Sequence, residues 1–159
     1  MKVFALAFAL AFIPAFANTE PINSSDILVL DGDSIRVHNQ SIRLVGFNAP
    51  EIQHAAYPAE QLQGDAAARR LRELVRGGNL DFIFVACSCP TSTQGTPMCN
   101  YGRACGVLKA GGRDVGEILI AEGLAVPFVC GATHCPPTPR PWCPIKLMRK
   151  RNDEQTRTT

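Results

Sequence analysis

The sequence lacks a strong net charge and, after its first residues, any long hydrophobic run. Lysine and arginine total 16 against 14 acidic residues, so the formal net charge is only +2. That charge is too small for bulk electrostatics to indicate nucleic-acid binding. No later stretch has the about 20 apolar residues that a membrane-spanning helix needs. Any binding of nucleic acid must therefore rest on a local site, and we predict no integral membrane association for the mature chain.

Two further patterns are missing. There is no internal repeat, which argues against a repeat architecture. There is also no Cys-x-x-Cys sequence, although the chain holds seven cysteines. A cysteine-dependent redox or metal-handling protein is consequently a weak alternative, because the usual motif of thioredoxin-like sites is absent.

The first 17 residues have the pattern of a secretory signal. Lys2 supplies a positive start, Val3 to Phe12 is almost continuously apolar, and Ala15-Phe16-Ala17 offers small residues for a signal peptidase. We predict cleavage after Ala17 and export to the periplasm or the extracellular space. An uncleaved membrane anchor is the alternative, but the apolar run is short for a bilayer span.

The cysteines are the most distinctive part of the composition. They are Cys87, Cys89, Cys99, Cys105, Cys130, Cys135 and Cys143. Behind an export signal such a set indicates a disulfide framework, whose pairing the sequence leaves open and whose odd count leaves one cysteine over. We expect disulfides to clamp the loop near residue 103 and to tie the segment 130–143 to the rest of the domain. A zinc site that includes His134 is the alternative, but the spacing fits no common zinc module.

The pattern of apolar and turn-forming residues predicts an α+β domain. Strands are expected at 27–30, 35–38, 42–45, 80–86 and 103–109, with a shorter one at 124–129, and helices at 58–75 and 114–122. Residues 18–25 are predicted to be a frayed polar lead-in, 26–130 the domain, and 131–159 a tail that is rich in cysteine and proline and then basic. Five main strands with a helix between the third and the fourth fit an OB-type barrel.

Three segments of the domain resemble the signature segments of a known family. They are Val29-Leu30-Asp31-Gly32-Asp33-Ser34, Arg43-Leu44-Val45-Gly46-Phe47-Asn48-Ala49-Pro50-Glu51, and Tyr101-Gly102-Arg103. In this order and at these separations they resemble the thermonuclease, or staphylococcal nuclease-like, family, over roughly residues 25–129. The resemblance implies a five-stranded OB-fold barrel with two main helices and a calcium-dependent endonuclease activity on DNA and RNA. We predict a monomer whose partner is its nucleic-acid substrate.

The resemblance also implies roles for individual residues. The matched catalytic positions are Arg43, Glu51 and Arg103, where Glu51 matches a residue discussed as a general base. The matched calcium ligands are Asp33, Asn48 and the backbone carbonyl of Ala49, with Asp31 nearby. Tyr101 matches a tyrosine near the bound nucleotide, and we expect Tyr101, Arg43 and Arg103 to bind the substrate.

These residue types suit phosphodiester hydrolysis. A hard divalent cation is bound by carboxylate and carbonyl oxygens and neutralises phosphate charge. Two guanidiniums grip phosphate oxygens in a planar, bidentate way that lysine does not reproduce. A nearby carboxylate can orient or deprotonate the attacking water. The sequence therefore predicts an exported nuclease with a compact arginine–acid site.

Asn48 is the main departure from the family pattern, because an aspartate usually stands at that position. An asparagine oxygen still binds a cation but brings no charge, so we predict weak calcium affinity and a lower calcium requirement in an Asn48→Asp variant. An unchanged or higher requirement would count against Asn48 as a ligand. The same departure keeps a second function open, a catalytically weak or inactive OB-fold module that binds nucleic acid or phosphate.

Overall fold

The computed structural model describes residues 20–142. The predicted signal peptide, Cys143 and the basic end of the tail lie outside these residues. The strands are β1 (Glu20–Ile22), β2 (Ile27–Asp31), β3 (Ser34–Val37), β4 (Gln40–Leu44), β5 (Gly46–Asn48), β6 (Leu80–Val85), β7 (Ala104–Ala110), β8 (Arg113–Asp114) and β9 (Val126–Phe128). The helices are α1 (Pro58–Arg76) and α2 (Val115–Ala121), with 3-10 turns at Ser24–Asp26, Thr91–Thr93 and Asn100–Gly102.

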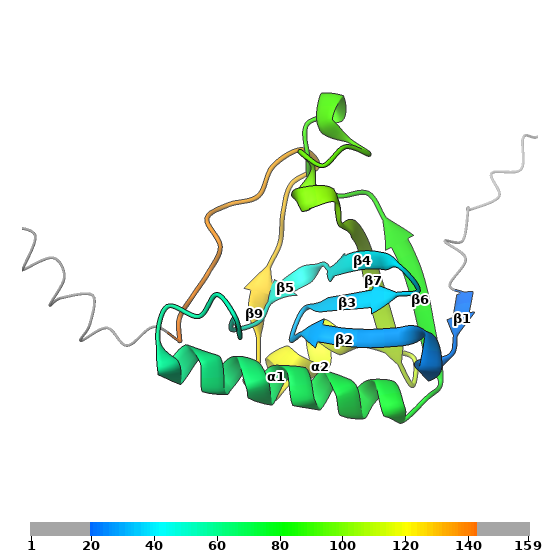
Figure 1. Ribbon diagram of the computed structural model, residues 1–159, viewed down its shortest axis with the longest axis vertical. Coiled ribbons are helices and arrows are strands. Elements are labelled where there is room, and N and C mark those ends of the chain that lie inside the picture. The colour runs from blue at the N-terminus through cyan, green and yellow to red at the C-terminus, as the bar shows by residue number, and fades with distance from the viewer. Residues whose placement is uncertain (1–19, 143–159) are drawn as a thin grey trace, which may run out of the picture.

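Most strands belong to one curled, half-barrel sheet. Their order is β1-β6-β7-β4-β3-β2, with β8 beside β7, while β5 and β9 pair separately. All pairs are antiparallel except β4 with β7. Figure 1 shows β2, β3 and β4 side by side above α1, with the loop that follows β6 at the opposite end of the molecule. The architecture is α+β, as predicted.

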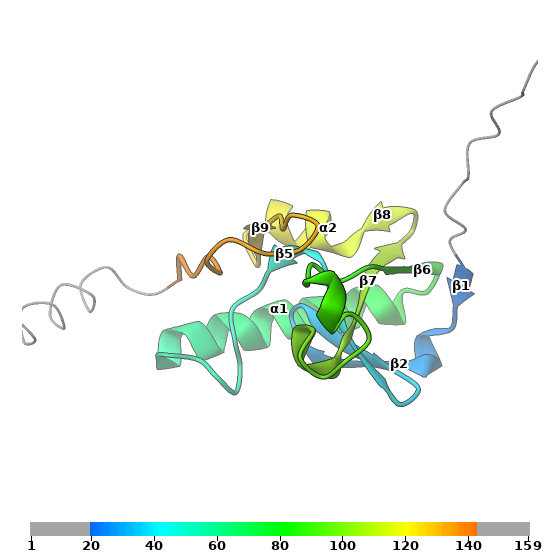
Figure 2. The ribbon, with the colours of Figure 1, turned by 90° about the horizontal axis from the view of Figure 1, so that it is seen from above.

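The two helices pack against the sheet and contribute side chains to the core. Viewed from above (Figure 2), α2 and β9 lie on one side of the molecule, β2 lies on the opposite side, and α1 runs between them. Helix α1 turns Ala67, Leu71 and Val75 inward, at the spacing of one helical face. These side chains pack against apolar residues of alternating strand positions, among them Ile35 and Ile42, which have no exposed surface.

The predicted elements form with small shifts at their ends. The five expected main strands become β2, β3, β4, β6 and β7, and both expected helices are present. The side chain of Asp114 caps α2 by accepting a 2.7 Å hydrogen bond from the Gly116 N–H. The sheet is larger than predicted, because β1 and β8 add two strands to it.

The interpretation of residues 18–25 as a frayed lead-in is wrong for part of that segment. Residues 20–22 form β1, which pairs antiparallel with β6 in the register Glu20↔Phe82 and Ile22↔Leu80. Strand β6 is otherwise an open edge with unpaired backbone groups, and β1 covers it. The sequence Glu20-Pro21-Ile22 is too short to show the hydrophobic alternation from which a strand could be predicted.

Six of the seven cysteines lie in the described part of the chain, and they form three disulfides. Cys87 bonds to Cys105, and Cys89 bonds to Cys99. Both disulfides close the loop that carries Arg103, as expected. The third joins Cys130 to Cys135, only 5 residues apart. The expectation that disulfides tie the tail to the domain is therefore wrong for Cys130 and Cys135, which pair with each other, and none of the described cysteines is left for zinc.

The disulfides and the helices bear on location. Three disulfides are consistent with an oxidising, exported environment. Among residues 20–142, neither helix combines the length and the apolar character needed to cross a bilayer.

Candidate active site

The tight turn between β2 and β3 carries the two aspartates of the predicted site. Gly32 lets this turn approach α1 closely: a Cβ placed there would lie 2.6 Å from the Ala49 Cβ and 2.8 Å from the Ala67 Cβ. The turn is consequently pressed against the helix and the end of β5. Asp33 is held at 7% exposure, one of the few buried charged side chains among the described residues.

Arg43 is the partner of Asp33. It leaves β4 and forms a salt bridge with the Asp33 carboxylate at 13% side-chain exposure. The same guanidinium donates to the Phe47 carbonyl at 3.1 Å and to Asn48 Oδ1 at 2.8 Å. The Ala49 N–H donates to Asp33 Oδ2 at 2.9 Å. The segments 31–34 and 43–49, separate in the sequence, therefore meet in one hydrogen-bonded cluster.

Arg103 is positioned by an unusual stretch of backbone. Asn100, Tyr101 and Gly102 have φ angles of 50°, 58° and 76°, so three consecutive residues occupy the left-handed region. That conformation turns the Asn100 side chain back onto Arg103, whose Nη2 donates to Asn100 Oδ1 at 2.9 Å. The Arg103 Nε also donates to the Asn100 carbonyl at 3.3 Å. Asparagine tolerates left-handed backbone better than most residues, which suits it to this place.

Sheet pairing and one serine join Arg103 to the rest of the cluster. In the parallel β4–β7 pair Arg43 lies opposite Cys105, two residues after Arg103. Ser34 Oγ accepts a 3.3 Å hydrogen bond from Arg103 Nη1 and donates a 3.2 Å hydrogen bond to Asp33 Oδ1. Ser34 thus bridges Arg103 and Asp33, a role that the sequence did not predict.

Glu51 is set in place by close packing of its backbone on α1. A Cβ at Gly64 would lie 2.7 Å from the Glu51 carbonyl oxygen and 2.8 Å from that of Pro50, so glycine is needed there. The charge of Glu51 lies close enough to Arg43 and Arg103 to oppose the lowering of their pKa values. The negative charge of Glu51, the third predicted catalytic residue, therefore acts on both Arg43 and Arg103.

The electrostatics of the cluster follow from its burial. Burial, followed by the positive charge of Arg103, lowers the pKa of Arg43 to about 10, so Arg43 remains a cation at neutral pH. Burial likewise lowers the pKa of Arg103. For Asp31 burial is the largest influence and raises its pKa, and the charge of Glu51 adds to that rise. The hydrogen bond from the Gly32 N–H to Asp31 Oδ1, at 2.7 Å, acts in the opposite direction.

Asp31 provides a test of this electrostatic environment. A raised pKa means that the charged carboxylate destabilises the fold above its folded-state pKa, while the protonated form does not. We expect Asp31→Asn to raise the thermal midpoint by a few degrees at pH 7. Near pH 3 the midpoint should be unchanged, because the Asp31 carboxyl group is then protonated in both the folded and the unfolded protein. Asp65→Asn, at an exposed position of α1, is the control. A lower midpoint at pH 7 for Asp31→Asn would refute this expectation.

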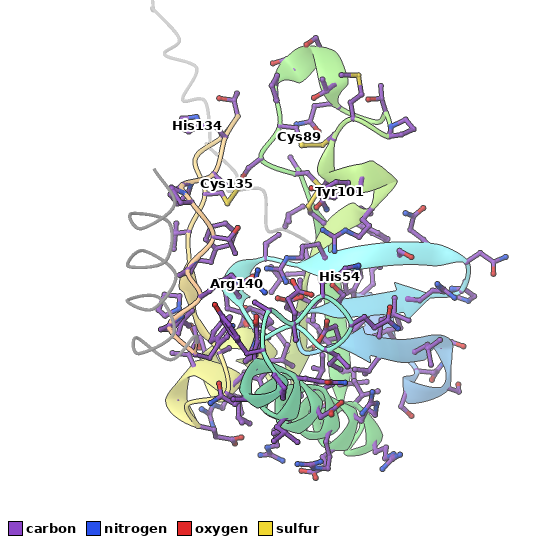
Figure 3. The ribbon with its side chains drawn as sticks, turned by 60° about the vertical axis from the view of Figure 1, so that its left-hand side comes forward. His54, Cys89, Tyr101, His134, Cys135 and Arg140 are labelled. Atoms are coloured by element: carbon purple, nitrogen blue, oxygen red, sulfur yellow. A yellow bond between two sulfur atoms is a disulfide. The ribbon has the colours of Figure 1, made fainter. Side chains whose placement is uncertain are left out.

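Tyr101 lies outside the buried cluster. Its side chain is 91% exposed, and the Arg103 guanidinium lies 5.8 Å from its ring centroid. Figure 3 shows Tyr101 beside Cys89, at the end of the molecule formed by the disulfide-bonded loop. An exposed ring next to a cationic side chain offers a surface on which a nucleotide base can stack.

The predicted calcium ligands fit a hard cation in their donor chemistry. Asp31, Asp33, Asn48 and the Ala49 carbonyl offer oxygens only, which is the donor type that calcium prefers. In this structure Asp33 is already engaged by Arg43 and the Ala49 N–H, and Asn48 Oδ1 by Arg43. Within residues 20–142 no three histidine, cysteine or acidic side chains gather as a metal-binding group. A cation would rely on the amide and carbonyl oxygens as well as on carboxylates.

Two residues outside the predicted set also belong to the cluster's surroundings. Asn100 and Ser34 each lie beside a predicted residue in the sequence, and that adjacency was the only signal they gave. The cluster as a whole draws on the segments 31–34, 43–51 and 100–103. No protein-family model matches the chain, and no curated protein sequence matches it significantly.

Proposed function

We propose that the protein is an exported, metal-dependent phosphodiesterase that cuts DNA and RNA. The observation that supports it most is the meeting of Arg43, Arg103 and Glu51 beside the Asp31–Asp33 turn. Together with the turn they come from three separate segments of the chain, 31–34, 43–51 and 100–103. A domain that needed only stability would gain little from gathering two partly buried arginines.

The proposed chemistry follows from the residue types. Arg43 and Arg103 bind the non-bridging oxygens of the scissile phosphate and stabilise the charge that grows there in the transition state. Glu51 orients a water and takes its proton as the water oxygen bonds to phosphorus. The bond to the leaving ester oxygen breaks, and that oxygen takes a proton from solvent. Tyr101 stacks on a neighbouring base.

The proposal also includes a bound calcium ion and an OB-type fold. When bound by oxygens of Asp33, Asn48 and Ala49, with Asp31 nearby, a calcium ion would supply positive charge beside the phosphate. The curled sheet and its two helices are compatible with an OB-type barrel of the thermonuclease kind. A site that one protein chain assembles by itself is consistent with action as a monomer.

Cleavage assays on the mature, oxidised chain test the function. Single- and double-stranded DNA and RNA are incubated with calcium, and then with a chelator in its place. We expect cleavage with calcium, and none with the chelator or in the Arg103→Ala variant. An Asn48→Asp variant is expected to reach half-maximal activity at a lower calcium concentration.

The same assay decides against the alternative function. Binding of oligonucleotides without cleavage, under every divalent cation tried, would overturn the proposal in favour of a phosphate-binding OB module. Cleavage that survives both the chelator and Arg103→Ala would overturn the assignment of these residues.

A further inference from the structure

The segment 136–142, here called the strap, crosses from one end of the molecule to the other. Figure 1 shows it in orange, running from the level of the disulfide-bonded loop to the N-terminal end of α1. It has no regular secondary structure, and most of its residues are exposed. In Figure 3, Arg140 of the strap lies beside the loop that carries His54, far below Cys135. The position of the strap must therefore come from a few specific contacts.

The first contact is a buried carboxylate. Glu60, in the first turn of α1, has no exposed surface. Its Oε1 accepts hydrogen bonds from Arg140 Nη2 at 2.6 Å and from Trp142 Nε1 at 2.7 Å, and its Oε2 accepts one from the Ala56 N–H at 2.8 Å. Arg140 also donates to the His54 carbonyl at 3.3 Å. Burial opposes ionisation of Glu60, but these hydrogen bonds outweigh it and hold its pKa below the usual range.

The second contact reaches the candidate active site. Asn48 is 4% exposed, and its Nδ2 donates a 3.1 Å hydrogen bond to the Pro139 carbonyl of the strap. Its Oδ1 accepts the 2.8 Å hydrogen bond from Arg43. A continuous chain of hydrogen bonds and ion pairs thus runs from Asp33 through Arg43 and Asn48 to the strap. Arg140, the next residue of the strap, binds Glu60.

We propose that the strap is a positioning element of the arginine–acid cluster, with Asn48 as the residue that connects the two. The Pro139 carbonyl holds the Asn48 amide so that Oδ1 faces Arg43. The amide serves both neighbours, because it accepts from the guanidinium and donates to the carbonyl, whereas an ionised carboxylate can only accept. An aspartate at position 48 would place a carboxylate oxygen against the Pro139 carbonyl oxygen, and the two acceptors would repel each other. The asparagine is thereby explained by the strap and not by a loss of function.

Docking of the strap can be measured without any activity. Trp142 is the only tryptophan of the chain, so its fluorescence and its quenching by acrylamide report whether the strap is bound. In chelator and without nucleic acid, we expect Arg140→Gln and Asn48→Asp each to increase the quenching. The double variant should show no more quenching than the stronger single variant, because both release the same segment.

Matched substitutions separate this effect from changes in charge. Asn39→Asp places the same new charge at an exposed turn, and Arg36→Gln removes an arginine from the exposed side of β3. Both should leave the quenching at the wild-type value. Arg140→Gln leaves the buried charge of Glu60 without its cation, and this variant could fail to fold for that reason. In that case the double variant Glu60→Gln/Arg140→Gln, which removes both charges, replaces it. Unchanged quenching in a folded Asn48→Asp protein would overturn the link between strap and cluster.

The positioning role itself rests on the proposed nuclease function and has its own measurement. Release of the strap by Arg140→Gln should lower kcat about ten-fold, as loss of an outer partner commonly does, with KM little changed. The further cost of Asn48→Asp at saturating calcium should be smaller in the Arg140→Gln background than in the wild type. A purely structural strap would instead lower the amount of folded enzyme and leave kcat per folded molecule unchanged.

The two parts of the experiment fail separately. Absence of cleavage in the wild-type protein would refute the nuclease proposal, and the quenching measurements would still decide whether Asn48 binds the strap. Increased quenching in Arg140→Gln together with an unchanged kcat would refute the positioning role.

Discussion

An Arg103→Lys variant is expected to lose about 100- to 1,000-fold in turnover while it keeps the fold, which is the cost of removing one well-placed transition-state donor. Lysine retains the charge but not the planar fork, which binds Asn100 and Ser34 in the structure and phosphate in the proposed mechanism. The main loss should therefore appear in kcat, because charge alone still attracts the substrate. Turnover under saturating oligonucleotide, together with the thermal midpoint, provides the measurement.

The matched control for Arg103→Lys is Arg36→Lys. Arg36 lies on β3 in the same sheet, but its side chain is exposed and outside the cluster. Its substitution should leave both turnover and thermal midpoint unchanged. Wild-type turnover in Arg103→Lys would show that the fork geometry is irrelevant, and an equal loss in both variants would indicate a general effect of surface charge.

Removal of the Cys87–Cys105 disulfide is expected to have the largest effect on stability. Cys87→Ser with Cys105→Ser opens a loop with a sequence separation of 18 residues. The unfolded chain then gains freedom equivalent to about 3 kcal/mol, which lowers the thermal midpoint by more than about 10 °C. Activity should fall as well, because Asn100 Nδ2 lies 3.4 Å from Cys105 Sγ and the loop that holds Arg103 loses this support.

The disulfide between Cys130 and Cys135 offers the comparison. It closes a loop with a separation of only 5 residues, and its removal by paired serine substitutions should cost less stability. Thermal unfolding of both double variants without reductant measures the difference. An equal loss in the two proteins would mean that loop closure does not explain the stabilisation.

Much of the fold could be predicted because its signals are local. The alternation of Ile35 and Val37, the helical spacing of Ala67 and Leu71, and the capping residue Asp114 each act over a few residues. The structure has the corresponding strands and helices. The candidate site residues were predicted from motifs, and the structure brings those of the segments 31–33, 43–51 and 103 together.

The remainder depends on contacts between distant segments. The bond between Asn48 and Pro139 joins residues 91 positions apart, and that between Glu60 and Trp142 joins residues 82 apart. No periodicity or spacing encodes such pairs. Glu60 lies in the first turn of α1, where the helix dipole is enough to explain an acidic residue without a partner. The pairing of Cys130 with Cys135 was equally open in the sequence.

The parallel pairing of β4 with β7 has a consequence for the timing of folding. Ile42 lies opposite Ala104, and α1 and β6 lie between the two strands in the chain. Contacts of such long range form late, because the chain must close a large loop before the pairing stabilises it. Arg43 and Arg103 consequently stay apart in a nascent or unfolded chain. If the two arginines act together as proposed, the protein is harmless to the nucleic acids of the cell that makes it until folding is complete.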